Sequence, residues 1–261
     1  MNAVRLFFIG GLTSYRALFS WLSPWILVPT FVLGPIFQIL FFAYVGRAAG
    51  AQDDAFFVIG NAVQYASIPC LFAMGNTISG ERQQATLPLL LASPAARIPL
   101  FLGRALPVIV NGLVVSVVAL FAGALLLGVH LRPESAVPLT LVVAVSAFAC
   151  TGLGLANAAL ALRVRETAVL PNILFGILLI FAGVNVPLSS LPPWMAAAAH
   201  WMPLTHGIDA ARRVAAGATL GAVRADLFAE AGLGLVYAAV GLGLLAWFER
   251  ESRRHATLDM A

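Results

Sequence analysis

The segment from residue 80 to residue 97, GERQQATLPLLLASPAAR, holds the residue types best suited to binding another protein. Leu87, Leu90 and Leu91 are spaced at i, i+3 and i+4, so a short helix here would present a leucine face. Two charged residues and two glutamines, which are readily hydrated, precede that face. The chemistry that this pattern predicts is docking, with an apolar helix face pressed into a groove on a soluble partner.

Both ends of such a helix are marked in the sequence. Thr86, followed two residues later by Pro88, suits a helix start, and Ser93 with Pro94 suits its end. A second interpretation stays open at this point, in which the segment is a plain connecting loop whose leucines rest on lipid headgroups.

The basic residues exclude several kinds of chemistry, because the chain has fifteen arginines and no lysine. A phosphate-binding loop of the Walker type needs a lysine after its glycines to reach the β and γ phosphates of a nucleotide. Schiff-base chemistry needs a lysine amine. The sequence therefore predicts that this chain is not its own P-loop ATPase.

The acidic residues are placed where an ion-coupled transporter could not use them. Such a transporter normally keeps an ionisable carboxylate at membrane depth, where the ion binds. We expect no carboxylate near the middle of an apolar run, because all of the acidic residues fall in loops, at the ends of the runs or in the tail: Asp53, Asp54, Glu81, Glu134, Glu166, Asp209, Asp226, Glu230, Glu249, Glu251 and Asp259.

Neutral polar side chains do occur inside the apolar runs, and two interpretations of them stay open. They satisfy one another across helix contacts, or some of them line a transport pathway. The side chains concerned are Gln38, Asn61, Gln64, Asn111, Asn157 and Asn185, and the candidates for the pathway are Gln38, Asn61, Gln64 and Asn185.

Cysteines and histidines do not form a reactive or metal-binding pattern. Cys70 and Cys150 fall inside apolar runs, where a small buried hydrophobe is the expected role. His200 and His206 have no further ligand at metal spacing, so we expect interface residues rather than a site. We find no nucleophile with a base inside the runs, which argues against an intramembrane enzyme.

Composition places the chain in a membrane. Of its 261 residues, 61% are hydrophobic and 10% are charged, against roughly 25% charged in an ordinary soluble domain. A helix needs about 20 residues to cross the bilayer, and six apolar segments are long enough. The sequence predicts an all-α membrane protein, one domain over residues 1–261, with spans at 25–46, 56–79, 100–129, 137–162, 167–188 and 229–248.

Residues 1–24 divide into an apolar and a polar face at helical spacing, which predicts an interfacial amphipathic helix; an irregular start to the first span is the alternative. With the amino terminus inside, ten arginines are cytoplasmic and five are outside. Since short cytoplasmic loops retain positive charge, both termini are predicted to be cytoplasmic. The five outside are Arg47, Arg132, Arg212, Arg213 and Arg224.

The long outer loop, residues 189–228, is rich in interfacial aromatics and predicts a short helical lid over the outer leaflet. Thr205 is expected to cap a short helix in which Asp209 faces Arg212 or Arg213 at i+3 or i+4. Two roles stay open for the loop, gating and simple shielding. Its candidate residues are Trp194, Trp201, Pro203, Asp209 and Arg212.

The last span carries a face of small residues that favours close helix packing, within the chain or between chains. The residues are Gly232, Gly234, Ala238, Gly241 and Gly243. Residues 249–261 are predicted to form a cytoplasmic tail.

Two motifs in this order resemble the permeases of ABC type-2 transporters. Glu81-Arg82, Ala85-Thr86-Leu87, Leu90-Leu91 and Ala92-Ser93-Pro94 resemble that family's loop between spans 2 and 3, of the form G-E-R-x-x-G-T-L-x-x-L-L-x-[ST]-P. Residues 191–214, LPPWMAAAAHWMPLTHGIDAARRV, resemble the loop before the last span. Daunorubicin-type drug exporters and nodulation-type lipo-oligosaccharide exporters are the most similar in appearance.

The resemblance implies a permease half whose short cytoplasmic coupling helix docks on a separate nucleotide-binding ATPase subunit. Two permease halves, copies of this chain or a related pair, would work with two such subunits, which hold the ATP and Mg; this chain itself would carry no cofactor or metal. The docking residues that it implies are Glu81, Arg82, Thr86, Leu87, Leu90, Leu91, Ser93, Pro94 and Arg97.

Ala85 and Pro88 depart from the family pattern, which usually has Gly and Glu at these positions, so docking would rest more on the leucines. The expected function is export of hydrophobic or amphipathic compounds such as drugs, lipids or glycolipids. The alternative is an ion-independent channel or facilitator without an ATPase partner. The arginine-rich, lysine-free composition is typical of a GC-rich bacterial genome. The expected location is a bacterial cytoplasmic membrane.

Overall fold

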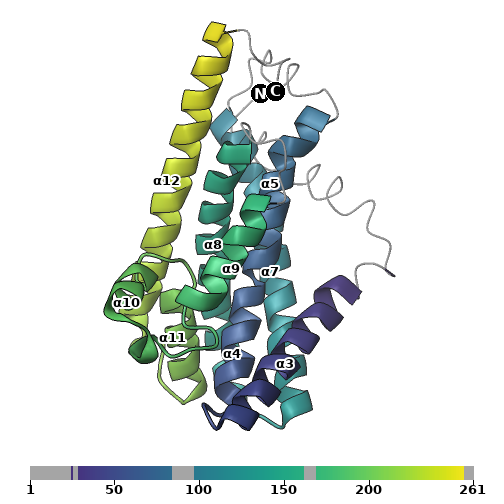
Figure 1. Ribbon diagram of the computed structural model, residues 1–261, viewed down its shortest axis with the longest axis vertical. Coiled ribbons are helices and arrows are strands. Elements are labelled where there is room, and N and C mark those ends of the chain that lie inside the picture. The colour runs from purple at the N-terminus through teal and green to yellow at the C-terminus, as the bar shows by residue number, and fades with distance from the viewer. Residues whose placement is uncertain (1–24, 26–28, 84–96, 162–168, 256–261) are drawn as a thin grey trace.

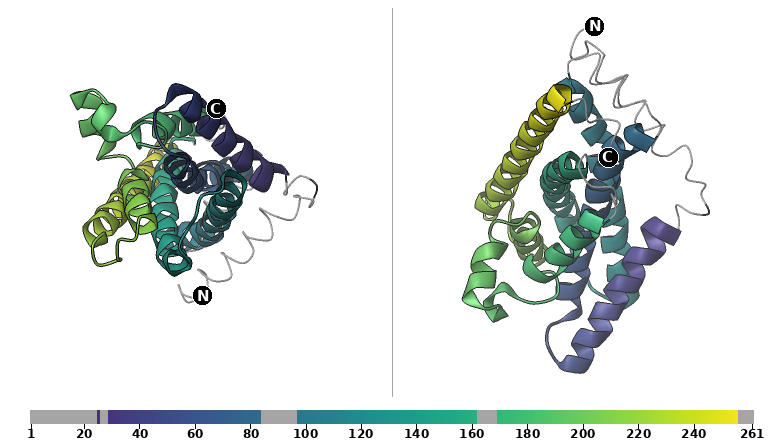
Figure 2. Two further views of the ribbon diagram at one scale, coloured as in Figure 1. Left: turned by 90° about the horizontal axis from the view of Figure 1, so that it is seen from below. Right: turned by 45° about the horizontal axis from the view of Figure 1, so that its top comes forward.

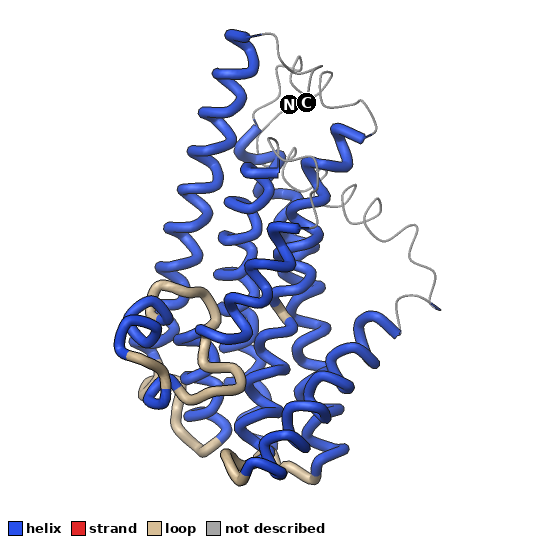
Figure 3. Tube along the Cα trace, viewed as in Figure 1, coloured by secondary structure: helices blue, strands red, loops and turns tan. Residues whose placement is uncertain are grey.

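A computed structural model describes Trp25 and residues 29–83, 97–161 and 169–255 of the chain. These residues form helices and connecting turns without a strand, which confirms the all-α class (Figure 3). The predicted interfacial helix at 1–24 and the core of the predicted coupling segment, 84–96, lie outside the described residues.

The described helices pack together into one bundle (Figure 1). The described elements are η1 (Pro29–Leu33), α3 (Gly34–Ala49), α4 (Asp54–Tyr65), α5 (Ser67–Gln83), α7 (Arg97–Leu127), η2 (Pro133–Ser135), α8 (Ala136–Ala161), α9 (Val169–Phe181), η3 (Leu188–Ser190), α10 (Pro193–Ala199), α11 (Thr205–Ala215) and α12 (Arg224–His255).

Among the described residues, five helical segments are long and apolar enough to cross a membrane. They correspond to predicted spans 1, 2, 3, 4 and 6, and run over Phe31–Ala49, Asp54–Gly75, Ala105–Leu127, Pro133–Leu160 and Arg224–Phe248. The chain is therefore a multi-pass membrane protein. At the end of the last span, α12 continues as a helix to His255, where the sequence predicted a tail from residue 249.

The fifth predicted span, 167–188, ends earlier in the structure than the sequence predicted. Its described helix, α9, covers Val169–Phe181 and begins where the described residues resume after the gap at 162–168. The chain leaves the helix after Phe181 and turns through Gly183, which has φ 73°. The apolar run continues past this turn, so hydropathy placed the end of the helix too late.

The prolines predicted inside spans lie within the described helices. Pro29 is the first residue of η1, which continues directly into α3, so Pro35 lies within one helical run from residue 29 to residue 49. Pro107 lies inside α7, and Pro171 lies in α9. The second span contains a break that hydropathy did not predict, with α4 ending at Tyr65 and α5 beginning at Ser67.

The core of the bundle is built around α4, whose residues from Phe57 to Tyr65 are all buried. Seen along the bundle, α4 lies among the other helices, while α3 and α12 lie at the outside (Figure 2). The outer faces of those two helices are apolar and exposed, as at Phe37, Phe41 and Leu235. An apolar surface on this scale is suited to lipid or to another membrane subunit.

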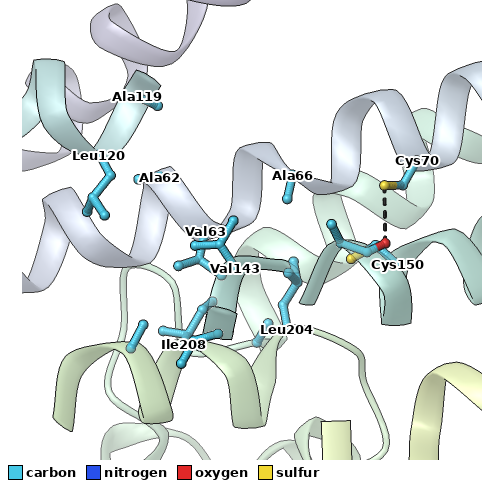
Figure 4. Packing of buried hydrophobic residues seen from close by; sticks show 14 of the residues in the cluster. Ala62, Val63, Ala66, Cys70, Ala119, Leu120, Val143, Cys150, Leu204 and Ile208 are labelled. Atoms are coloured by element: carbon cyan, nitrogen blue, oxygen red, sulfur yellow. Dashed lines mark hydrogen bonds between the residues drawn. The ribbon is translucent and has the colours of Figure 1, made fainter. Parts of the chain in front are cut away.

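Helix α11 is part of this core and does not lie over it as a lid. It packs against α4, α8 and α12, and Ile208, Ala211 and Val214 are at most 1% exposed. In Figure 4, Leu204 and Ile208 lie beside Val63 and Val143. The predicted surface lid is therefore wrong for α11, because one face of the helix is small and apolar enough to enter the bundle.

Small residues set the contact between α8 and α12. A Cβ added to Gly234 would lie 2.7 Å from Ala149 Cα, and one added to Gly241 would lie 2.6 Å from the backbone nitrogen of Ala156. A Cβ added to Gly232, by contrast, would have nothing within 4 Å. The predicted small-residue face therefore serves a contact within the chain at Gly234 and Gly241.

We expect Gly234→Ala to destabilise the protein, because the added methyl group would force two backbones apart at a cost of about 1–3 kcal/mol. The measurement is the midpoint of thermal unfolding in detergent, which should fall by several degrees. Gly232→Ala on the same helix is the matched control and should be neutral or slightly stabilising, since alanine favours helix. Equal midpoints for the two variants would contradict the assigned contact.

Candidate functional site

Four amide side chains come together where α3, α4 and the turn after α9 meet. Gln38 Nε2 donates to Asn61 Oδ1 at 2.9 Å and to Gln64 Oε1 at 3.1 Å. Asn61 Nδ2 in turn donates to Asn185 Oδ1 at 2.7 Å and to the Phe57 carbonyl oxygen at 2.9 Å. We call Gln38, Asn61, Gln64 and Asn185 the amide cluster.

The amide cluster joins all four residues that the sequence singled out for a pathway. Within the part of the chain that the structure describes, two of its donors, Gln64 Nε2 and Asn185 Nδ2, are buried without a hydrogen-bond partner. Gln64 and Asn61 are fully buried, whereas Gln38 and Asn185 are partly exposed. The cluster is therefore closed on the side of Asn61 and Gln64 and partly open on the side of Gln38 and Asn185. The two other amides lie apart from it: Asn157 donates to the Leu71 carbonyl oxygen, and Asn111 is on α7.

Arg212, in the last turn of α11, fixes the turn that carries Asn185. Its guanidinium donates to the carbonyl oxygens of Gly183 at 2.8 Å, Val184 at 2.9 Å and Phe56 at 3.1 Å. The guanidinium carbon lies 3.5 Å from the centroid of the Phe56 ring. Burial lowers the pKa of Arg212 to about 10, so the side chain stays charged at neutral pH.

The backbone of α4 leaves room for this arrangement at one residue. A Cβ added to Gly60 would lie against the Val184 carbonyl oxygen and the Arg212 guanidinium. The chain therefore needs glycine at this position for α4, α11 and the turn after α9 to approach one another.

Glu230 fixes the other end of α11. It lies within the first two turns of α12 and is 0% exposed. One carboxylate oxygen accepts from the Leu204 backbone N–H at 2.6 Å, and the other accepts from the Gly207 N–H at 3.1 Å. These N–H groups belong to the start of α11, which has no partners for them within its own helix. Glu230 therefore performs the capping role that the sequence predicted for Thr205.

Thr205 itself does not cap the helix: its Oγ1 is buried and, among the described residues, has no hydrogen-bond partner. The sequence placed Glu230 at the end of a span and did not predict that its side chain is buried. The signal in the sequence was a lone acidic residue between Leu227 and the apolar residues that follow, where a solvated carboxylate has no obvious place.

Arg212 and Arg213 make their hydrogen bonds with partners other than the predicted Asp209, although the nearby Asp209 charge raises the pKa of Arg212 against the effect of burial. Arg212 donates to backbone carbonyl oxygens, and Arg213 Nη1 pairs with Asp226 Oδ2 at 2.6 Å. Asp209 is exposed on the opposite face of α11 from its buried residues. Tertiary partners on the turn after α9 and on α12 outcompeted a local pair at i+3 or i+4, which is worth little on an exposed surface.

The remaining loop residues divide between surface and core. Trp194 and Trp201 are 67% and 70% exposed, as interfacial aromatics would be, and Pro203 is buried. His206 Nε2 lies 3.1 Å from the His200 carbonyl oxygen. In the described residues, no group of three or more His, Cys, Asp and Glu side chains is arranged to hold a metal ion.

The predicted docking residues are partly described. Glu81 and Arg82 lie in the last turn of α5, and Arg97 is the first residue of α7, whereas the sequence predicted all three in the loop from 80 to 97. The end of α5 and the start of α7 lie at the end of the bundle away from α11 (Figure 1). Thr86, Leu87, Leu90, Leu91, Ser93 and Pro94 lie outside the described residues.

We expect Arg212→Met to lower stability by about 2 kcal/mol, because it leaves three backbone carbonyl oxygens without their charged donor. Thermal unfolding of the purified protein measures this loss. Arg213→Met is the matched control, since its ion pair is half-exposed and is worth under about 1 kcal/mol. If Arg213→Met is the more damaging change, Arg212 does not hold the turn.

Comparison with protein families supports the resemblance seen in the two motifs. The ABC-2 type transporter family model matches residues 8–215, which include the amide cluster, Arg212 and the segment between α5 and α7. A search of curated proteins gave no match. The chain belongs to the ABC-2 type transporter family and is a membrane-spanning permease subunit.

Proposed function

We propose that this chain is the permease subunit of an ATP-driven exporter that moves hydrophobic or amphipathic compounds, such as drugs, lipids or glycolipids, out of the cytoplasm or the inner leaflet. The family match carries the proposal. The chain has no lysine to complete a Walker loop, so the work has to come from another subunit.

The proposed partners are two nucleotide-binding ATPase subunits, which hold ATP and Mg, and a second permease subunit, either a copy of this chain or a related one. Docking is proposed at residues 81–97. What supports this position is the leucine face in the sequence, and the ends of α5 and α7 at one end of the bundle (Figure 1). The proposed location is a bacterial cytoplasmic membrane with both termini in the cytoplasm.

The proposed cargo contact is the amide cluster. Its side chains are neutral, so they can hydrogen-bond to a cargo without the large cost of burying a charge. Its spare donors, Gln64 Nε2 and Asn185 Nδ2, suit hydroxyl, carbonyl or ether oxygens on a mainly apolar molecule. This supports an amphipathic cargo.

The docking proposal is tested by Leu90→Asp combined with Leu91→Asp. Charges on the leucine face should leave membrane insertion intact but abolish stimulation of the partner ATPase and reduce export, because an apolar groove would reject them. Leu89→Asp, in the same segment but off the i, i+3, i+4 face, is the matched control and should be milder. Undiminished export by the double variant would count against docking here.

The cargo contact is tested by Asn61→Leu, which removes the central amide of the cluster at similar volume. Half-maximal stimulation of ATPase activity by a hydroxylated cargo should need about fivefold more cargo, which corresponds to about 1 kcal/mol for one hydrogen bond. Asn157→Leu, at a buried amide on α8 outside the cluster, should not shift it. A shift of the same size in both variants would contradict a specific contact.

A further inference from the structure

Helix α11 is held at both ends by charged side chains whose partners are backbone groups. Glu230 of α12 accepts from the N–H groups of Leu204 and Gly207 at its start, and Arg212 in its last turn donates to carbonyl oxygens of α4 and of the turn after α9. We propose that Glu230 is a positioning residue for the cargo contact. It holds the start of α11 in place, and α11 in turn, through Arg212, aligns Asn185 with Asn61. This inference rests on the proposed function of the amide cluster.

The first step is the attachment of α12 to α11. A carboxylate at a helix start interacts favourably with the helix dipole, and charge-assisted hydrogen bonds are stronger than neutral ones. Both oxygens of Glu230 are used, at 2.6 Å and 3.1 Å, and the side chain is 0% exposed. A buried carboxylate on two N–H groups fixes both the position and the rotation of the helix start.

The start of α11 is closely packed, so its position is sensitive to small shifts of α8 or α12. A Cβ added to Gly207 would meet the hydroxyl of Ser146 on α8 and would lie 3.5 Å from the Glu230 carboxyl carbon. The start of α11 is thus held between α8 and α12 without space for a side chain. A displacement there has to move the whole of α11, which is a single helix of 11 residues.

The second step carries the position of α11 to the amide cluster. Arg212 lies five residues after Gly207 on the same helix and holds the carbonyl oxygens of Gly183 and Val184. The side-chain oxygen of the next residue, Asn185, accepts from Asn61 Nδ2 at 2.7 Å, and Asn61 Oδ1 accepts from Gln38. A continuous series of contacts therefore runs from α12 to α3.

A second link between α11 and α12 provides the comparison that isolates Glu230. Arg213 pairs with Asp226, which lies one turn before Glu230 on α12, but both side chains are partly exposed. Asp226→Asn makes the same carboxylate-to-amide change on the same pair of helices. It should matter little, because exposed ion pairs contribute little.

The experiment measures the alignment of Asn185 with Asn61 by cross-linking. The full-length chain, in membranes, carries Cys70→Ala and Cys150→Ala together with Asn61→Cys and Asn185→Cys. A short thiol-reactive cross-linker is applied, and the cross-linked peptide is quantified by mass spectrometry. Because the cysteines replace the Asn61–Asn185 hydrogen bond, their alignment depends on Arg212 and the seat of α11.

Adding Glu230→Gln should lower the cross-linking yield several-fold, since the amide group offers one acceptor oxygen and turns an N–H donor toward a backbone N–H. Adding Asp226→Asn should leave the yield unchanged. A yield with Glu230→Gln equal to that of the parent, or an equal fall with Asp226→Asn, overturns the inference. If the Gln variant does not accumulate, Glu230→Asp, which keeps the charge but shortens its reach, should give an intermediate yield, and a parental yield overturns the inference.

The same substitutions in the chain with native Asn61 and Asn185, assembled with its ATPase, separate positioning from general damage. Glu230→Gln should raise the cargo concentration for half-maximal ATPase stimulation several-fold and change the maximal rate less. A fall in maximal rate alone contradicts a positioning role. If cross-linking falls as expected but no variant, nor the parent, shows cargo-stimulated ATPase activity, the proposed function fails while the positioning by Glu230 stands.

Discussion

Backbone groups inside a membrane-spanning bundle have no water to bond, so each break in a helix needs a partner from the protein itself. This constraint explains two charged side chains, the partly buried Arg212 and the fully buried Glu230. The chain leaves helix α9 at Ala182, and Arg212 supplies donors to the carbonyl oxygens of the turn. The chain enters α11 at Leu204, and Glu230 supplies acceptors to the N–H groups there.

The position of α11 follows from these two contacts and from its composition. Its buried face is made of small and aliphatic residues, and Gly207 and Gly60 allow it to approach α8 and α4 closely. Once α11 is seated, the turn after α9 has a fixed place, and Asn185 comes within reach of Asn61. The amide cluster is thus a consequence of how the helix breaks are satisfied.

The polar side chains of the amide cluster are all neutral. The cluster contains no carboxylate that could carry an ion. Each amide makes a hydrogen bond with another amide of the cluster. These bonds limit the cost of burial, which is about 1–3 kcal/mol for an unpaired polar group. That arrangement is consistent with the proposed function, in which a separate ATPase would supply the energy. Glu230, which is fully buried, is bound to backbone N–H groups, and so its role is to hold a helix.

The sequence by itself determined the membrane class, five of the spans and the family motifs, because hydropathy over about 20 residues and local spacing are properties of the chain alone. It also supplied all four members of the amide cluster as polar residues in apolar runs. Only the tertiary structure decided that they meet, that α9 stops early, and that α11 is buried. Asp209, Thr205 and Glu230 show the physical reason: local spacing predicts partners three or four residues away, whereas their actual surroundings come from helices distant in the sequence, which compete for the same hydrogen bonds.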